Sequence, residues 1–264
     1  MTRLSIALLA GLLLLATPFQ VALAAAQTIR VGVTPGAQAE IMNEVRRVAA
    51  TEGLALDVVV FDQPARIDAA LAAKQIDVAS FEDAAALDAQ RKQHGYALSS
   101  VATTVTFPVA LYSRKLTHLG QLQRGATIAI PDDRDGIARA LILLQNETLL
   151  TFRDGAGLHA TLADITGNRL NLKIRSLPRA RLYDSLNSVA FAVIDSDTAA
   201  RAGLQPARDG LSLEDARSPY ANVLTVRDAD RGNPWVAQLV AAYHSNDVAH
   251  FILTRYQDSV RRPW

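Results

Sequence analysis

One arginine, Arg139, has surroundings that raise a chemical question. It belongs to the stretch "ATIAIPDDRDGIARALILLQ" (residues 126–145), in which an apolar run stops at Pro131 and an acidic loop leads into a pattern typical of a helix. We expect Arg139 in the first turn of that helix, which otherwise looks suited to burial. One interpretation is a surface ion pair with Asp133 or Asp135, which are close in sequence and acidic.

The residue types that usually catalyse reactions form no recognisable site. The histidines lack the spacings of metal ligands; they are His94, His118, His159, His244 and His250. No nucleophile elbow, phosphate-binding loop or dinucleotide fingerprint occurs, and the sequence has no cysteine. Acidic pairs such as Glu82-Asp83 are more often solvated turns or helix caps than catalytic dyads. The sequence therefore predicts no enzyme, no metal site and no cofactor.

The first residues predict export from the cytoplasm. A basic Arg3, a short apolar stretch and small residues near position 24 form the pattern of a secretory signal peptide over residues 1–24. Its removal lowers the formal net charge from +1 to 0, because Arg3 is the only charged residue there. A neutral chain gives no reason to expect a nucleic-acid partner. Because no cysteine is available for lipidation, we expect a soluble protein in the periplasm.

Strand-like apolar runs alternate with helical patterns, which is typical of an α/β fold with mainly parallel sheets covered by helices on both faces. The predicted strands are residues 28–34, 54–62, 76–81, 96–113, 126–132, 172–178, 189–195 and 218–228. The predicted helices, besides that of Arg139, are residues 37–53, 63–75, 82–95, 179–188, 196–204 and 234–256.

Two of these segments predict a division into lobes. "TFPVALYSRKL" (106–116) leaves one series of strands and helices, and "SPYANVLTVRD" (218–228) returns after another. We therefore predict two α/β lobes joined by two crossing strands, with a ligand-binding cleft between them. The first lobe is expected to comprise residues 28–108 and 224–264, and the second residues 109–223.

Four blocks of sequence together resemble one known family. They are "IRVGVTPGAQAEI", "TFPVALYSRKL", "GATIAIPDDRDGIARALILLQ" and "SPYANVLTVR". In this order and spacing they resemble the NlpA/MetQ family, which are methionine-type substrate-binding proteins of ABC importers. The similarity runs from about Thr28 to Trp264. It implies a type 2 periplasmic-binding-protein fold, closure on an amino acid, and delivery of that ligand by a monomer to an inner-membrane permease.

The resemblance implies roles for two residues. Arg139 matches the arginine that binds the ligand's α-carboxylate, and an arginine fork suits a carboxylate because two parallel hydrogen bonds form. The N-terminus of its helix would add positive potential. Asn222, in "SPYANV", matches the asparagine that holds the ligand's polar head. The alternative for Asn222 is a turn-capping role.

Departures from the family occur in the same pocket. Glu82 and Asp83 replace a Gln-His pair, and Asp195 replaces a second ligand-facing asparagine. We expect all three near the ligand. Unpartnered buried carboxylates are costly, so an acidic pocket favours a ligand that brings positive charge. The sequence thus predicts a polar or cationic amino acid rather than L-methionine. The alternative is that Glu82 and Asp83 point into solvent and methionine remains the ligand.

Aromatic side chains are also fewer than in the family. Ala86 replaces a tyrosine, and a Phe-x-Tyr-Pro motif is Val105-Thr106-Phe107-Pro108 here. Val105 and Phe107 are therefore expected to line the pocket, with weaker contacts to a thioether. Two other functions stay open. One is a diverged family member that interacts in the cell envelope without transport, because one fold serves several functions. The other is an enzyme on the same scaffold.

Overall fold

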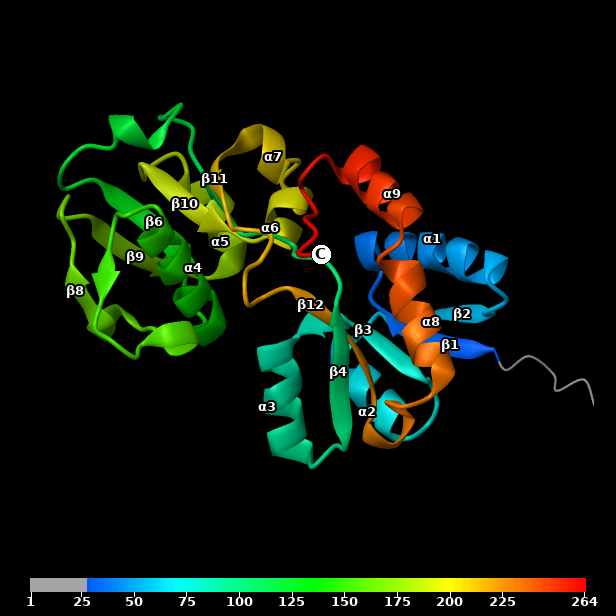
Figure 1. Cartoon of the computed structure of the whole chain (residues 1–264). Helices are drawn as coiled ribbons and strands as arrows, with labels where there is room; N and C mark the ends of the chain where they lie inside the picture. Colours follow the sequence, from blue (N-terminus) through cyan, green and yellow to red (C-terminus); the bar gives the residue numbers. More distant parts are fainter. Residues whose placement is uncertain (1–27) are drawn as a thin grey trace, which may run out of the picture.

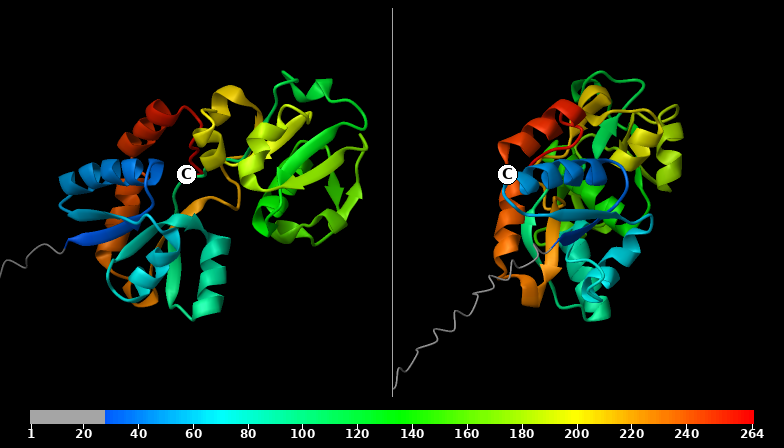
Figure 2. Two further views of the ribbon diagram at one scale, coloured as in Figure 1. Left: turned by 180° about the vertical axis from the view of Figure 1, so that it is seen from behind. Right: turned by 90° about the vertical axis from the view of Figure 1, so that its right-hand side faces the viewer.

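The computed structural model describes residues 28–264 (Figure 1). The predicted signal peptide lies outside these residues. Two α/β lobes lie side by side, and the left view in Figure 2 shows the chain passing between them near the C-terminus. No helix among residues 28–264 is long and apolar enough to cross a bilayer.

The first lobe is built on a five-stranded sheet with the order β2-β1-β3-β12-β4. Its strands are β1 (Ile29–Val33), β2 (Leu56–Val60), β3 (Val78–Asp83), β4 (Leu98–Thr103) and β12 (Asn222–Arg227). Its helices are α1 (Ala37–Thr51), α2 (Ile67–Ala72), α3 (Ala84–His94), α8 (Pro234–Tyr243) and α9 (Asn246–Tyr256). Two apolar clusters cover the two faces of the sheet: α1, α8 and α9 pack on one, and α2 and α3 on the other.

The second lobe has a five-stranded sheet with the order β11-β5-β10-β6-β9. Its strands are β5 (Ala110–Tyr112), β6 (Thr127–Pro131), β9 (Lys173–Leu177), β10 (Phe191–Ile194) and β11 (Gly210–Leu213), beside a small sheet of β7 (Thr151–Phe152) and β8 (Ile165–Gly167). Its helices are α4 (Arg134–Asn146), α5 (Arg179–Ser185), α6 (Ser196–Arg201) and α7 (Pro206–Asp209). Short 3-10 turns complete both lobes: Pro64–Arg66, Leu119–Gln121, Gly157–His159, Leu162–Asp164 and Asp228–Asp230.

Both sheets are mixed, but four of the five strands in each run in one direction, which agrees with the prediction of mainly parallel sheets. β1 pairs with β2 and β3 in parallel, but β12 pairs antiparallel with β3 and β4. In the second lobe β6 pairs in parallel with β9 and β10, while β5 runs antiparallel to β10 and β11. The one reversed strand in each sheet, β5 or β12, is the strand by which the chain arrives from the other lobe.

The C-terminal segment 234–256 forms two helices, and the prediction of one continuous helix is wrong. Helix α8 ends at Tyr243 and α9 begins at Asn246. Ser245 caps α9 by accepting a hydrogen bond from the Val248 backbone N–H with its Oγ, at 3.3 Å. A serine at an N-cap satisfies a helix donor that would otherwise lack a partner, so it favours a new start over continuation.

Two connections join the lobes. Residues 104–109 run from β4 to β5, and residues 214–221 run from β11 to β12. The predicted lobe boundary at 108/109 falls in the first connection, whereas that at 223/224 falls two residues into β12. The lobe boundaries stay a prediction. A third segment meets the connections, because Thr106 and Arg261 exchange backbone hydrogen bonds of 2.8 and 2.9 Å.

Candidate functional site

Arg139 lies in the second turn of α4, so its predicted place in the first turn is wrong. The helix begins at Arg134 because Asp133 is its N-cap and accepts a hydrogen bond from the Gly136 N–H at 2.8 Å. Arg139 is therefore too far along α4 for the N-terminal dipole to act on a ligand at its guanidinium.

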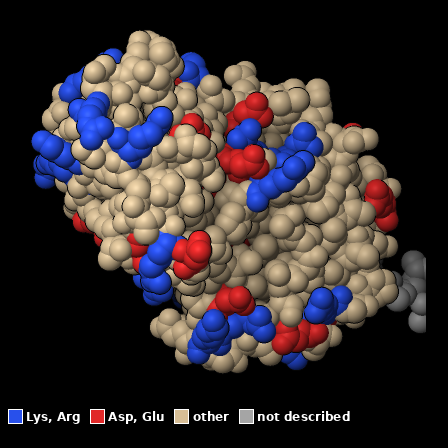
Figure 3. Space-filling view, turned by 60° about the vertical axis from the view of Figure 1, so that its left-hand side comes forward, with Lys and Arg blue, Asp and Glu red and all other residues tan. Residues whose placement is uncertain are grey.

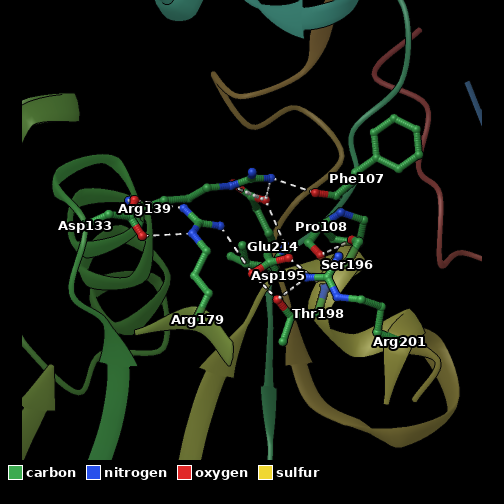
Figure 4. A network of polar contacts seen from close by, with 12 residues as sticks. Phe107, Pro108, Asp133, Arg139, Arg179, Asp195, Ser196, Thr198, Arg201 and Glu214 are labelled. Carbon is green, nitrogen blue, oxygen red and sulfur yellow. Dashed lines mark hydrogen bonds and ion pairs between the residues drawn. The ribbon is translucent and has the colours of Figure 1, made fainter. Parts of the chain in front are cut away.

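The guanidinium of Arg139 is held at the junction of the lobes by an internal carboxylate (Figure 4). Its Nε donates to both carboxylate oxygens of Glu214, at 2.9 and 3.0 Å. Its Nη2 donates to Glu214 and also, at 2.7 Å, to the carbonyl oxygen of Phe107. The ring of Tyr220 lies 5.0 Å from the guanidinium carbon, within cation–π range. Nη1 has no hydrogen-bond partner among residues 28–264, and 21% of the Arg139 side chain is exposed.

Glu214 ties several segments together at this point. Its side chain is only 7% exposed and accepts hydrogen bonds from the Ser218 Oγ at 2.6 Å and the Val109 N–H at 3.2 Å. Its backbone carbonyl accepts from Arg261 Nη1 at 2.7 Å. Both connections between the lobes, helix α4 and the C-terminal segment therefore meet at one buried residue, Glu214.

Neither Asp133 nor Asp135, the predicted ion-pair partners, binds Arg139. Asp133 instead forms two hydrogen bonds of 2.8 and 2.9 Å with Arg179, which lowers the pKa of the Asp133 carboxyl. Arg179 also lies 3.2 Å from Asp195 through its Nη1. Asp195 is the N-cap of α6 and accepts hydrogen bonds from the backbone N–H and the side-chain Oγ1 of Thr198, both 2.9 Å. This second network lies beside Arg139 and is likewise satisfied internally (Figure 4).

The first lobe contributes Asn222, Asp83 and Glu82. The Nδ2 of Asn222, at the start of β12, donates to the Phe81 carbonyl at 3.0 Å. Asp83 is the N-cap of α3, and its Oδ1 accepts from the Ala85 and Ala86 N–H groups, both at 2.9 Å. Glu82 is half-buried, and burial raises its pKa to about 9, with neighbouring carboxyls adding to the effect.

Tyr220 links the two sides of the junction electrostatically. Burial raises the pKa of its hydroxyl to about 12, and the charges of Arg139 and Asp83 both act on it. Arg139 of the second lobe lies over the Tyr220 ring, and Asp83 of the first lobe pairs with Asn222, two residues after Tyr220. Such a pair of opposite charges suits a ligand that carries both signs.

The predicted pocket residues of the first connection have different positions. The Val105 side chain is 0% exposed and belongs to the core of the first lobe. Phe107 packs its ring partly against the same core and offers its carbonyl to Arg139. The structure thus brings together Arg139, Asn222 and Asp83 around Tyr220, and leaves the side chain of Val105 away from them.

The sequence did not place Glu214, Tyr220 or Arg179 at the candidate site, although it predicted a hinge near Tyr220. Glu214 lies just before the quoted "SPYANV", and Tyr220 lies inside it. The only signal was their nearness to this block, because Glu214 and Arg139 are 75 residues apart in sequence. Among residues 28–264 no group of three or more acidic or histidine side chains is placed to hold a metal ion. On the face in Figure 3, acidic and basic side chains are interspersed.

These features define the class of protein before any comparison. The first α/β lobe is built from two separate stretches of the chain, and the second lobe from the stretch between them. Two connections cross between the lobes, and charged groups of both signs meet at the junction. The chain has the two-lobed fold of periplasmic binding proteins, as predicted. A family model described as NlpA lipoprotein matches residues 29–264. The chain belongs to the NlpA lipoprotein family, which confirms the resemblance found in the sequence.

Relatives of known name support this assignment. The D-methionine-binding lipoprotein MetQ of Escherichia coli (strain K12) is 37% identical over 223 residues, which are 83% of this chain and 82% of that protein. A solved structure of a nutrient-binding protein from Burkholderia cenocepacia bound to methionine has 39% identity and a TM-score of 0.72, covering 88% of this chain and 98% of its own. A periplasmic substrate-binding protein of an ABC transporter from Coxiella burnetii has 37% identity and a TM-score of 0.74, with coverages of 89% and 99%.

Proposed function

We propose that the protein is the receptor of an ABC importer and binds a zwitterionic α-amino acid of the methionine class between its lobes. One observation carries the proposal. The guanidinium of Arg139 keeps Nη1 without a partner, while Asp83 from the other lobe keeps Oδ2 without a donor among residues 28–264. An α-carboxylate suits the first group and an α-ammonium suits the second.

The charges around the junction support a zwitterion over an anion or a cation. Arg139 and Glu214 already neutralise each other, so an anion would find no uncompensated positive charge, and a cation would leave Nη1 of Arg139 without an acceptor. A zwitterion adds no net charge and places each pole against an opposite one. Asn222 is already oriented by the Phe81 carbonyl, and its amide oxygen is left for a donor of the ligand.

The ligand side chain is proposed to be neutral. The expectation of a cationic side chain rested on three unpartnered carboxylates, and none of the three is left to bind a cation on the ligand side chain, because Asp83 is assigned to the α-ammonium. Asp195 pairs with Arg179, Asp83 caps α3, and the pKa of Glu82 is raised to about 9 by burial, so it stays protonated at neutral pH. The names of the relatives, which include binding of methionine, point in the same direction.

A thermal-shift panel tests the proposal. L-methionine, D-methionine, glutamine, lysine, arginine and ornithine are added to ligand-free protein, and native mass spectrometry first checks for a co-purified ligand. A ligand at about 100 times its Kd stabilises the folded state by about 2.7 kcal/mol. We expect a methionine enantiomer to give the largest rise in Tm and the basic amino acids little or none. A larger rise in Tm with lysine or ornithine would support the prediction of a cationic ligand. No rise with any compound would contradict amino-acid binding.

The partner and location follow from the same proposal. The ligand is handed to a permease in the inner membrane, and the protein acts as a monomeric binding protein rather than an enzyme. Relatives are named lipoproteins, but these 264 residues contain no cysteine to carry a lipid. We propose a soluble periplasmic receptor, and fractionation by osmotic shock checks this by the compartment in which the protein is recovered.

A further inference from the structure

Two buried acid groups in the first lobe face each other without donors. Asp68, on α2, is 4% exposed, and its Oδ1 is buried with no hydrogen-bond donor among residues 28–264. The Oε1 of Glu82, near the end of β3, is also buried and has no hydrogen-bond donor among these residues. Buried polar atoms almost always have partners, so two such atoms on adjoining elements need an explanation.

An irregularity in β3 explains why these side chains meet. Asn222 pairs with Asp83 and Leu224 with Ser80, so two steps along β12 match three along β3. Such an extra residue is a β-bulge, which redirects a side chain. Phe81 packs in the cluster on the α2 face of the sheet, and Glu82 contacts Asp68 on that same side through their carboxyl groups.

Two ionised carboxylates offer only acceptors, so they hydrogen-bond to each other only when a proton lies between them. The other charged groups that act on the pair are Asp83, which follows on the same strand, and His94 at the end of α3. Neither forms an ion pair with Asp68 or Glu82. We propose that Asp68 and Glu82 share one proton in the folded protein, and that this proton makes the ligand-binding end of β3 sensitive to pH.

The sign of the pH effect follows from burial. Burial raises the pKa of Asp68, and it raises that of Glu82 from 4.5 to about 9, helped by the charges of Asp68 and Asp83. A carboxyl with a raised pKa in the folded state contributes stability fully below its ordinary pKa and loses it as the pH rises through the folded value. Stability should therefore fall between about pH 4.5 and about pH 9.

The pair is connected to the proposed ligand site by one residue. The carbonyl of Phe81, directly before Glu82, accepts the hydrogen bond from Asn222 at 3.0 Å and another from Gln38 at 3.2 Å. When the proton leaves, two like charges are buried side by side, and Glu82 gains by turning toward solvent. That movement displaces the carbonyl that orients Asn222. Loss of the proton is therefore expected to weaken ligand binding.

Infrared spectroscopy and melting test the shared proton without any ligand. Wild-type protein at pH 7 should show the carbonyl stretch of a protonated carboxylic acid, and Glu82→Gln should lack it. The amide of the variant donates to Asp68 at every pH. Its Tm should therefore exceed that of the wild type by about 3 °C or more at pH 8.5 and match it at pH 5. Glu52→Gln, on an exposed residue, is the matched control and should follow the wild type. Absence of the band, or parallel melting profiles, would overturn the proposal.

The coupling to ligand rests on the proposed function and has its own measurement. Calorimetry measures the Kd for L-methionine at pH 6.5 and pH 8.5. The factor by which the Kd increases should be at least about three times larger for the wild type than for Glu82→Gln. Equal changes in both proteins would overturn the coupling. If the wild type binds no amino acid at all, the proposed function fails, while the infrared and melting results still decide whether the proton is shared.

Discussion

At the scale of the residue, Arg139 has both an internal partner and a nitrogen left for a ligand. Removing its side chain leaves Glu214 buried and without a counter-charge. Loss of one member of a buried pair typically costs about 3–5 kcal/mol of stability. Arg139→Ala should therefore lower both stability and ligand affinity, the latter by about 2 kcal/mol or more because a charge-assisted hydrogen bond is lost. Urea denaturation and calorimetry measure the two effects separately.

The control for this prediction is Arg175→Ala, an exposed arginine on the edge strand β9 of the same lobe. It should change stability by no more than about 0.5 kcal/mol and leave affinity alone. If Arg139→Ala lost stability but kept full affinity, the guanidinium would be a purely structural tie between α4 and the connections. In that case the proposed carboxylate site would have to lie elsewhere.

The sequence identified Arg139 but not its environment, and the reason is physical. A guanidinium beside an apolar helix pattern is visible in one short window, whereas its partner depends on how two distant connections fold together. The acidic residues nearest in sequence, Asp133 and Asp135, were plausible partners, but Asp133 caps α4 and faces Arg179. Likewise the acidity at Glu82 was visible, while its proton-sharing contact with Asp68 required the bulge in β3.

At the scale of elements, local patterns predicted most strands and helices but not every boundary. Alternating apolar runs are short-range signals, so β1 and β6 begin and end within one residue of the predictions. The break between α8 and α9 was missed because the apolar periodicity continues through it, and a single cap at Ser245 decided the outcome. The reversed direction of β5 and β12 was out of reach, since it depends on how the chain enters each lobe from the other.

The C-terminal segment offers a test at this scale. The Trp264 ring stacks on His244 with centroids 4.6 Å apart, and its Nε1 donates to the Thr104 carbonyl at 2.6 Å. These contacts hold the first connection between the lobes from outside. Trp264→Ala should destabilise the protein by about 2 kcal/mol, less than for a fully buried tryptophan because the ring is half-buried. Urea midpoints measure this effect.

The matched change for Trp264 is Leu253→Ala on α9, where the residue is 50% exposed. Leu253→Ala should lower the free energy of unfolding by no more than about 0.5 kcal/mol, because little apolar area leaves the core. Equal midpoints for Trp264→Ala and the wild type would show that the segment merely lies against the connection without supporting it.

At the scale of the whole molecule, the proposed ligand must touch both lobes at once. Arg139 belongs to one lobe and Asp83 and Asn222 to the other. Within residues 28–264, residues 104–109 and 214–221 join the lobes, and the C-terminal segment lies beside them. A ligand that binds groups on both sides has more contacts in a closed arrangement, so it shifts the population toward closure by its differential affinity. We expect a hinge near Pro108 and Tyr220 and rigid-body rotation of the lobes.

Small-angle scattering checks this closure. The radius of gyration of the wild type should decrease on saturation with the ligand found in the thermal-shift panel. Arg139→Ala at the same ligand concentration should keep the radius of the free protein, because one of the two lobes has lost its contact. An unchanged radius for the saturated wild type would mean that the ligand binds to one lobe alone, and the bridging role of the Arg139 and Asp83 pair would then have to be abandoned.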